Sequence, residues 1–141
     1  MGQAQKNSFD VLIDTSGFIA YFRAGDMFHA EASDLFDKVS QEQLDVATTN
    51  LILMETATVL SFRDGHETAK HFLDTMDSLT FPVIQVDMDM QQQTIALFKQ
   101  QAIRGTSMVD CSSVVVMERL HIPRILTFDA FFKQVKLKRF A

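Results

Sequence analysis

The chain has 141 residues, of which 47% are hydrophobic and 22% are charged, and its formal net charge is −5. This composition predicts one globular domain with its own core, because 141 residues suffice to bury one without disulfides. The single cysteine excludes an internal disulfide, no apolar run approaches the ~20 residues of a membrane span, and residues 1–9 lack a signal-peptide core. We expect a soluble, cytoplasmic protein with no membrane partner, a flexible tail at 1–7 and one domain at 8–141.

Hydrophobic periodicity divides the chain into alternating strands and helices. Strands are predicted at residues 11–13, 44–49, 81–86 and 123–128, with a further edge strand at 133–141. Helices are predicted at residues 15–26, 28–41, 51–62, 66–79, 87–101 and 107–120. The helix at 51–62, capped by Thr49 or Asn50, is apolar almost all round and is expected to be buried. Alternating strands and helices predict an α/β fold with a mostly parallel sheet, covered on both faces, and a site at the carboxyl ends of its strands.

Four carboxylates stand in apolar surroundings. Asp14 follows the predicted strand "VLI" and Asp129 follows the strand in "ILTFD", so parallel strands bring both to the same edge of the sheet. Glu55 is the only charge between Leu51 and Phe62, and a bare charge there is costly unless it has a partner or a metal.

The fourth acid, Asp110, lies three residues after Ser107. This spacing resembles a capping box and places the carboxylate at the start of the helix at 107–120. Each acid also has a structural interpretation, as a helix cap, a turn cap, a charge in a first helical turn or the partner of a buried arginine. Four clustered carboxylates, however, repel one another unless cations neutralise them, and hard oxygen ligands prefer Mg²⁺ or Mn²⁺. Their coincidence therefore favours a metal site.

Together, "LIDTSGFIAYF", Glu55 within an apolar helix, "SMVD" and "LTFDAFF" resemble the PIN-domain nucleases, most closely the small stand-alone VapC-type toxins. The resemblance covers residues 9–132 in the family's order and spacing. It implies a three-layer α/β/α sandwich and a metal-dependent endoribonuclease that hydrolyses RNA phosphodiester bonds, the toxin of a toxin–antitoxin pair. It also implies an RNA substrate, a cognate antitoxin, a homodimer, and one or two Mg²⁺ or Mn²⁺ ions held by Asp14, Glu55, Asp110 and Asp129. Hydroxyl groups that flank these acids have supporting roles in this interpretation: Thr15, Ser16, Ser107 and Thr127.

The sequence departs from the family pattern at two positions. Phe131 stands where many relatives carry a polar or acidic residue, which puts the metal in doubt on the Asp129 side. Cys111 stands where the family usually has alanine, and a buried thiol fits there. A catalytically silent PIN-like module that binds only RNA or a protein is therefore an alternative function. Phosphoryl transfer to Asp14 is disfavoured, because position 16 is serine rather than a second aspartate.

Several other polar residues are better explained by local structure. His66 and His71 are five residues apart and lie on different helix faces, unlike a zinc-binding pair. Asp87 and Asp89 follow a predicted strand and are second-tier ligand candidates, although a helix cap and a favourable first-turn charge explain them better. Arg104 precedes the helix of the fourth acid, where a basic residue could meet RNA phosphate, but a plain loop arginine explains it better.

The charges are unevenly distributed along the chain. Residues 1–98 hold 5 Lys and Arg against 15 Asp and Glu, whereas residues 99–141 hold 8 against 3. This asymmetry fits an acidic site beside a basic binding surface, and a solvated C-terminal tail explains it equally well. Phe128, Phe131 and Phe132 offer a platform for stacking bases, although anchoring in the core is the default expectation.

Overall fold

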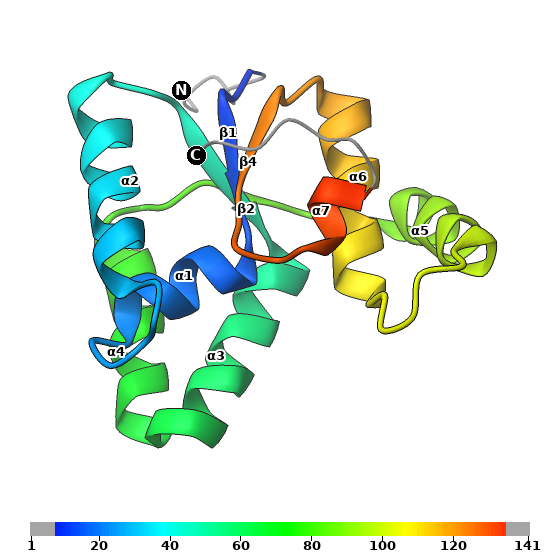
Figure 1. Cartoon of the computed structure of the whole chain (residues 1–141). Coiled ribbons are helices and arrows are strands. Elements are labelled where there is room, and N and C mark those ends of the chain that lie inside the picture. Colours follow the sequence, from blue (N-terminus) through cyan, green and yellow to red (C-terminus); the bar gives the residue numbers. More distant parts are fainter. Residues whose placement is uncertain (1–7, 135–141) are drawn as a thin grey trace.

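The chain, in a computed structural model, forms a four-stranded parallel sheet with seven helices in the described residues, 8–134 (Figure 1). The strands are β1 (Val11–Ile13), β2 (Val46–Thr49), β3 (Val83–Ile84) and β4 (Arg124–Leu126). The helices are α1 (Thr15–Phe22), α2 (His29–Gln41), α3 (Asn50–Asp64), α4 (His66–Ser78), α5 (Met88–Gln100), α6 (Met108–Leu120) and α7 (Phe131–Gln134). The tail predicted at 1–7 lies outside the described residues.

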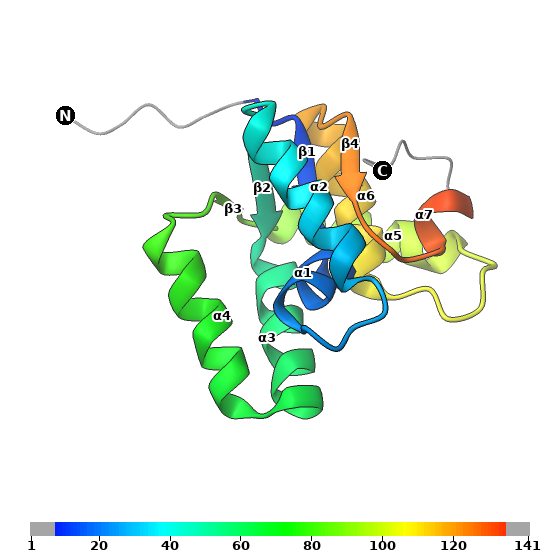
Figure 2. The same ribbon diagram turned by 60° about the vertical axis from the view of Figure 1, so that its left-hand side comes forward.

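The sheet lies between two helical layers. Figures 1 and 2 show α1 and α2 on one side of the sheet and α5 and α6 on the other, and α3 and α4 form a hairpin that extends beyond the carboxyl ends of the strands. This arrangement confirms the predicted α/β/α sandwich. In the part of the chain described here, no helix is long and apolar enough to cross a membrane.

The strand order, β3-β2-β1-β4, determines where the site lies. The chain runs outward from β1 to β3 and then returns to the other side of β1 as β4, so the order reverses between β1 and β4. Such a reversal leaves a crevice at the carboxyl ends of the two strands. Ile13 pairs with Leu126, and the Asp14 N–H donates to the Leu126 carbonyl oxygen at 3.1 Å. The residues after the two strands therefore leave the sheet at the same level.

Side-chain caps and a buried aromatic cluster explain why these elements form. Thr49, Asp87 and Ser107 each accept a hydrogen bond from the backbone N–H three residues later, at the starts of α3, α5 and α6. Phe18 of α1 is fully buried, and its ring makes edge-on contacts with Phe72 at 5.3 Å and with Phe81 at 5.7 Å. These contacts fix α1 against α4 and the chain before β3.

The structure corrects two predictions about the elements. The helix expected to be buried all round, α3, exposes Met54 and Phe62, because α1 and α4 cover only part of its surface. The edge strand predicted at 133–141 is wrong for residues 133 and 134, which belong to α7, and residues 135–141 lie outside the described part. The start of α7 is capped by Asp129, whose Oδ1 accepts from the Phe131 N–H at 2.9 Å.

Candidate active site

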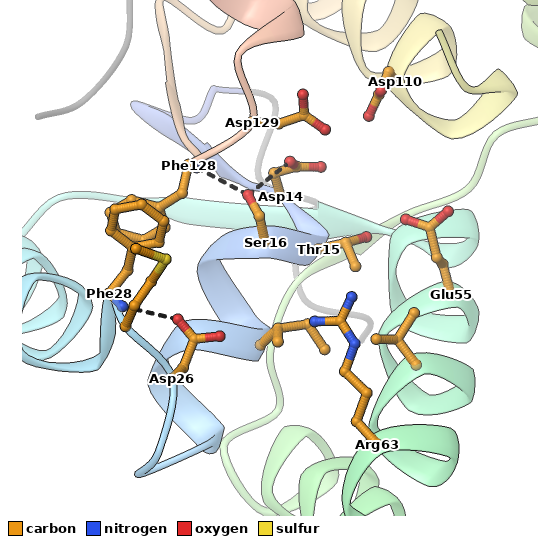
Figure 3. Close-up of a pocket in the computed structure, with 13 residues that line it drawn as sticks. Asp14, Thr15, Ser16, Asp26, Phe28, Glu55, Arg63, Asp110, Phe128 and Asp129 are labelled. Carbon is orange, nitrogen blue, oxygen red and sulfur yellow. Dashed lines mark hydrogen bonds between the residues drawn. The ribbon is translucent and has the colours of Figure 1, made fainter. Parts of the chain in front are cut away.

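A cavity of about 290 Å³ opens at the carboxyl ends of β1 and β4 (Figure 3). All four predicted acids line it, and each comes from a different part of the fold: the β1–α1 junction, α3, the first turn of α6 and the β4–α7 loop. The cavity lining also contains Thr15, Ser16, Asp26, Phe28, Arg63 and Phe128. The structure therefore brings together residues that are up to 115 positions apart in the sequence, from Asp14 to Asp129.

Asp14 is held by hydroxyl groups rather than acting as a helix cap. It occupies the position before α1, but its carboxylate makes no capping hydrogen bond. Thr127 Oγ1 donates to Asp14 Oδ2 at 2.9 Å, and Ser16 Oγ donates to the same oxygen at 3.2 Å. The other carboxylate oxygen, Oδ1, is buried without a hydrogen-bond partner in the described part of the chain, as is Thr15 Oγ1. An ionised oxygen in this state is costly unless it binds something.

The same two hydroxyl groups position the loop that carries Asp129. Ser16 Oγ accepts from the Phe128 N–H at 2.9 Å, and Thr127 Oγ1 accepts from the Asp129 N–H at 3.0 Å. Thr127 and Ser16 thus connect the acid after β1 to the acid after β4. Because Phe131 is buried in the core, its apolar side chain does not occupy the cavity.

Asp110 is buried at the start of α6, where Ser107 Oγ accepts a hydrogen bond from the Asp110 backbone N–H at 2.9 Å. Burial, followed by repulsion from Asp14 and Asp129, raises the pKa of Asp110 from 3.8 to about 7. The pKa of Asp14 is raised from 3.8 to about 6, chiefly by burial. Burial therefore disfavours the ionised form of each acid when nothing neutralises it, and repulsion from neighbouring carboxylates adds to this effect.

These pKa shifts predict how the stability of the metal-free protein depends on pH. Both pKa values are higher in the folded than in the unfolded chain, so folding takes up protons, and the free energy of unfolding falls as the pH rises from about 4 to about 7. In EDTA we expect the melting temperature at pH 5.5 to exceed that at pH 8 by roughly 5 °C. An Asp14→Asn, Asp110→Asn double variant should lose most of this difference. An equal difference in the double variant would contradict the assignment.

Glu55 is half-buried on α3 and faces the cavity from the side opposite Asp129 (Figure 3). Within residues 8–134, Glu55 has no buried arginine as a partner. Arg63, eight residues later on α3, also lines the cavity, but its side chain is exposed, and it has no hydrogen-bond or ion-pair partner within residues 8–134. Nothing in the sequence pattern singled out Arg63, because an arginine near the end of a helix is common.

The donor set fits a hard divalent cation. It consists of carboxylate oxygens with neighbouring hydroxyls, and it includes Asp14 Oδ1, which has no hydrogen-bond partner in the part of the chain described. Within residues 8–134, no three Asp, Glu, His or Cys side chains already lie close enough to hold a metal. A cation at this position would therefore have to draw the carboxylates together by side-chain rotation.

Besides Thr127, which contacts Asp14 without being part of the lining, four further candidates lie outside the cavity lining. Ser107 caps α6, and Asp87 caps α5 by accepting the Met90 N–H at 2.9 Å. Asp89 forms an ion pair with Arg119 at 2.8 Å, so its carboxylate is already engaged. Arg104 is exposed in the α5–α6 loop, away from the cavity lining.

The sequence reasoning missed a wall formed by aromatic residues. Phe28 and Phe128 stack with ring centroids 4.8 Å apart and planes 9° from parallel (Figure 3). The sequence indicates Phe128 as part of a possible stacking platform, but its partner Phe28 comes from the α1–α2 loop, which no local pattern connects to β4. The other two phenylalanines considered, Phe131 and Phe132, are core residues, as expected.

Comparison with known proteins identifies the family. The model of the PIN domain matches residues 11–138. The chain belongs to the PIN domain family. One relative is VapC20, described as a 23S rRNA-specific endonuclease, from two Mycobacterium tuberculosis strains, CDC 1551/Oshkosh and H37Rv. VapC20 is 31% identical to this PIN domain over 122 residues. The aligned region covers 86% of this chain and 91% of VapC20.

A solved structure shows the same relationship. The crystal structure of M. tuberculosis VapC20, described as a toxin that cleaves the sarcin–ricin loop, matches this PIN domain with a TM-score of 0.80 and 29% identity, covering 90% of this chain and 95% of VapC20. These similarities confirm the predicted VapC-type ribonuclease toxin and favour it over the silent binding module.

Proposed function

We propose that this PIN domain hydrolyses RNA phosphodiester bonds with one or two Mg²⁺ or Mn²⁺ ions held by Asp14, Glu55, Asp110 and Asp129. The observation that carries this proposal is the convergence of four carboxylates from four elements on one cavity, where Asp14 Oδ1 is buried with no hydrogen-bond partner among the described residues. A bound divalent cation supplies the charge that offsets their repulsion and lowers the pKa of water for attack on phosphorus.

The chain's own residues hold the acids in place for this reaction. Thr127 and Ser16 fix one oxygen of Asp14, and the other, which has no hydrogen-bond partner in the described residues, would be available to hold a cation. Ser107 holds Asp110 at the start of α6 by accepting a hydrogen bond from its backbone N–H. In the reaction, a water oxygen forms a bond to phosphorus while the bond to the 3′ oxygen breaks, and the 3′ oxygen leaves with a proton. The products are then a 5′-phosphate and a 3′-hydroxyl.

The proposal also specifies the nucleophile. Carboxyl groups of the lining, among them Asp110 with its pKa of about 7, can act as general base and acid for water or for the RNA 2′-hydroxyl, so the ends that are produced distinguish the two reactions. We propose that water is the nucleophile.

The test is cleavage of total bacterial RNA by the purified chain, with mapping of the ends produced. We expect cleavage with Mg²⁺ or Mn²⁺, no cleavage in EDTA, and 5′-phosphate ends. A synthetic hairpin that spans a mapped cut should also be cleaved when the nucleotide before the cut is 2′-deoxy. Cleavage in EDTA, or 2′,3′-cyclic phosphate ends lost on 2′-deoxy substitution, would contradict the proposal.

The relatives suggest which RNA to examine first. VapC20 is described as specific for 23S rRNA, and the similarity covers nearly the full length of both chains. We propose a structured ribosomal RNA element as the substrate of this chain. Mapping the cuts in whole ribosomes and in protein-free RNA would identify it.

The partners implied by the family also belong to this proposal. We propose a cognate antitoxin and a homodimer, supported by apolar surface on the α3–α4 hairpin, where Phe62 is 87% exposed and Met54 is 56% exposed. Light scattering of the purified chain tests the dimer, and co-purification with the product of an adjacent gene tests the antitoxin. A cytoplasmic location remains a prediction.

A further inference from the structure

Two features of the cavity wall have no role in the proposed hydrolysis. One is the guanidinium of Arg63, and the other is the stacked pair Phe28 and Phe128. Figure 3 shows the Arg63 guanidinium directed into the cavity from α3, with the aromatic pair on the far side of Ser16.

Arg63 is the one cation among the described residues of the lining, which contains five carboxyl groups: Asp14, Asp26, Glu55, Asp110 and Asp129. It follows Glu55 by eight residues, or about two helical turns, so both side chains lie on the same face of α3. An exposed guanidinium with no partner within residues 8–134 can donate hydrogen bonds from its planar N–H groups to phosphate oxygens, which it binds in a bidentate manner.

A purely structural role for Arg63 is a favourable charge in the last turn of α3. Arg119 occupies the equivalent last turn of α6, but Asp89 binds it at 2.8 Å. The two arginines therefore share the helix-end environment and differ in their partners. This difference makes Arg119 a matched control.

The aromatic pair presents apolar surface at the same cavity. Phe28 is 36% exposed, and its neighbour Met27, also in the lining, is 87% exposed. The Phe28–Phe128 pair is the one parallel stack among the ring pairs of the described residues, whereas the others are tilted or edge-on. Any of the four nucleobases can stack on such a surface, because every base has a π-face.

We propose that Arg63 and the Phe28–Phe128 pair form a subsite for one unpaired nucleotide next to the bond that is cut. Arg63 binds the phosphate of this nucleotide, and Phe28, supported by Phe128, contacts its base. The nucleotide must be unpaired because the face of a base within a duplex is covered by its stacked neighbours. This inference rests on the proposed ribonuclease function.

The first arm of the test measures the phosphate contact. The probe is a fluorescently labelled hairpin spanning a mapped cut, bound to the Asp14→Asn chain in Mg²⁺ so that it stays intact. Adding Arg63→Gln should weaken binding about 10-fold and reduce the slope of log K against log salt by about 0.7, the value for one phosphate of a single strand. Arg119→Gln should change neither quantity.

The second arm measures the base contact. Phe28→Ala, in the same background, should weaken binding of the intact hairpin about 10-fold. Against a hairpin with an abasic residue at one position beside the cut, Phe28→Ala should have no further effect. Phe98→Ala, which removes a ring of similar exposure (38%) on α5, serves as the matched control and should have no effect on either hairpin.

The outcomes separate the subsite from the proposed function. If the wild-type chain cuts no RNA and the Asp14→Asn chain binds none, the ribonuclease proposal and the subsite are both wrong. If RNA is cut and bound, but Arg63→Gln keeps the wild-type salt slope, the subsite is wrong. It is also wrong if Phe28→Ala weakens binding equally for the intact and every abasic hairpin, because Phe28 would then act only through the loop's structure.

Discussion

Replacing Asp14 with asparagine is expected to lower the rate of RNA cleavage by about 10³-fold without destabilising the fold. The substitution keeps the shape of the side chain and an oxygen to accept the Thr127 hydroxyl. It removes the charge at the position of Oδ1, which is buried without a partner in the described part of the chain. The proposed cation therefore loses a ligand.

The stability of Asp14→Asn shows why lost activity would not reflect unfolding. Burial raises the pKa of Asp14 to about 6, so the ionised acid is unfavourable in the metal-free fold at pH 8. A neutral amide should leave the melting temperature in EDTA unchanged or higher. Cleavage rates and melting curves of the same preparations check both expectations. Full activity, or a melting temperature several degrees lower in EDTA, would contradict the role assigned to Asp14.

Replacing Gly17 with alanine is expected to lower the free energy of unfolding by about 2 kcal/mol. A Cβ at position 17 would lie 2.7 Å from Leu126 Cδ2 and 3.0 Å from the Leu126 carbonyl oxygen. The backbone of β4 can give way only by moving away from α1, which outweighs the gain of up to about 1 kcal/mol in helix propensity. Such a movement would also separate Thr127 from Asp14.

Gly25 provides the control for this experiment, because a Cβ there would meet nothing within 4 Å. Chemical denaturation should show Gly17→Ala as clearly destabilised and Gly25→Ala as close to wild type. Because the site depends on the same contact, Gly17→Ala should lose cleavage activity as well. Equal stability of both variants would mean that α1 is not tightly packed on β4.

The sequence was sufficient to predict the sheet and the acids for a definite reason. Strand ends in a parallel sheet share one edge, so Asp14 and Asp129 were identified from the residues that precede them. Glu55 was conspicuous because it interrupts an apolar helix, and Asp110 because of its spacing from Ser107. Each signal is local to a few residues.

The features that the sequence did not predict depend on contacts between distant loops. Phe28 reaches Phe128 across 100 residues, and nothing near either residue indicates the other. In the sequence, Arg63 resembles any arginine at a helix end, and only the folded structure places it in the cavity lining. The exposure of α3 was misjudged, because its apolar composition does not reveal how little of it the neighbouring helices cover.

The measurement that tests the central claim most directly is calorimetric titration of Mn²⁺ into the wild-type chain and four single variants: Asp14→Asn, Glu55→Gln, Asp110→Asn and Asp129→Asn. We predict that the wild type binds Mn²⁺ and that each substitution weakens binding at least about 10-fold, since each removes a charged ligand from one shared site. Absence of binding by a wild-type chain that is folded, or binding that all four substitutions leave unchanged, would contradict the claim that these acids form one metal site.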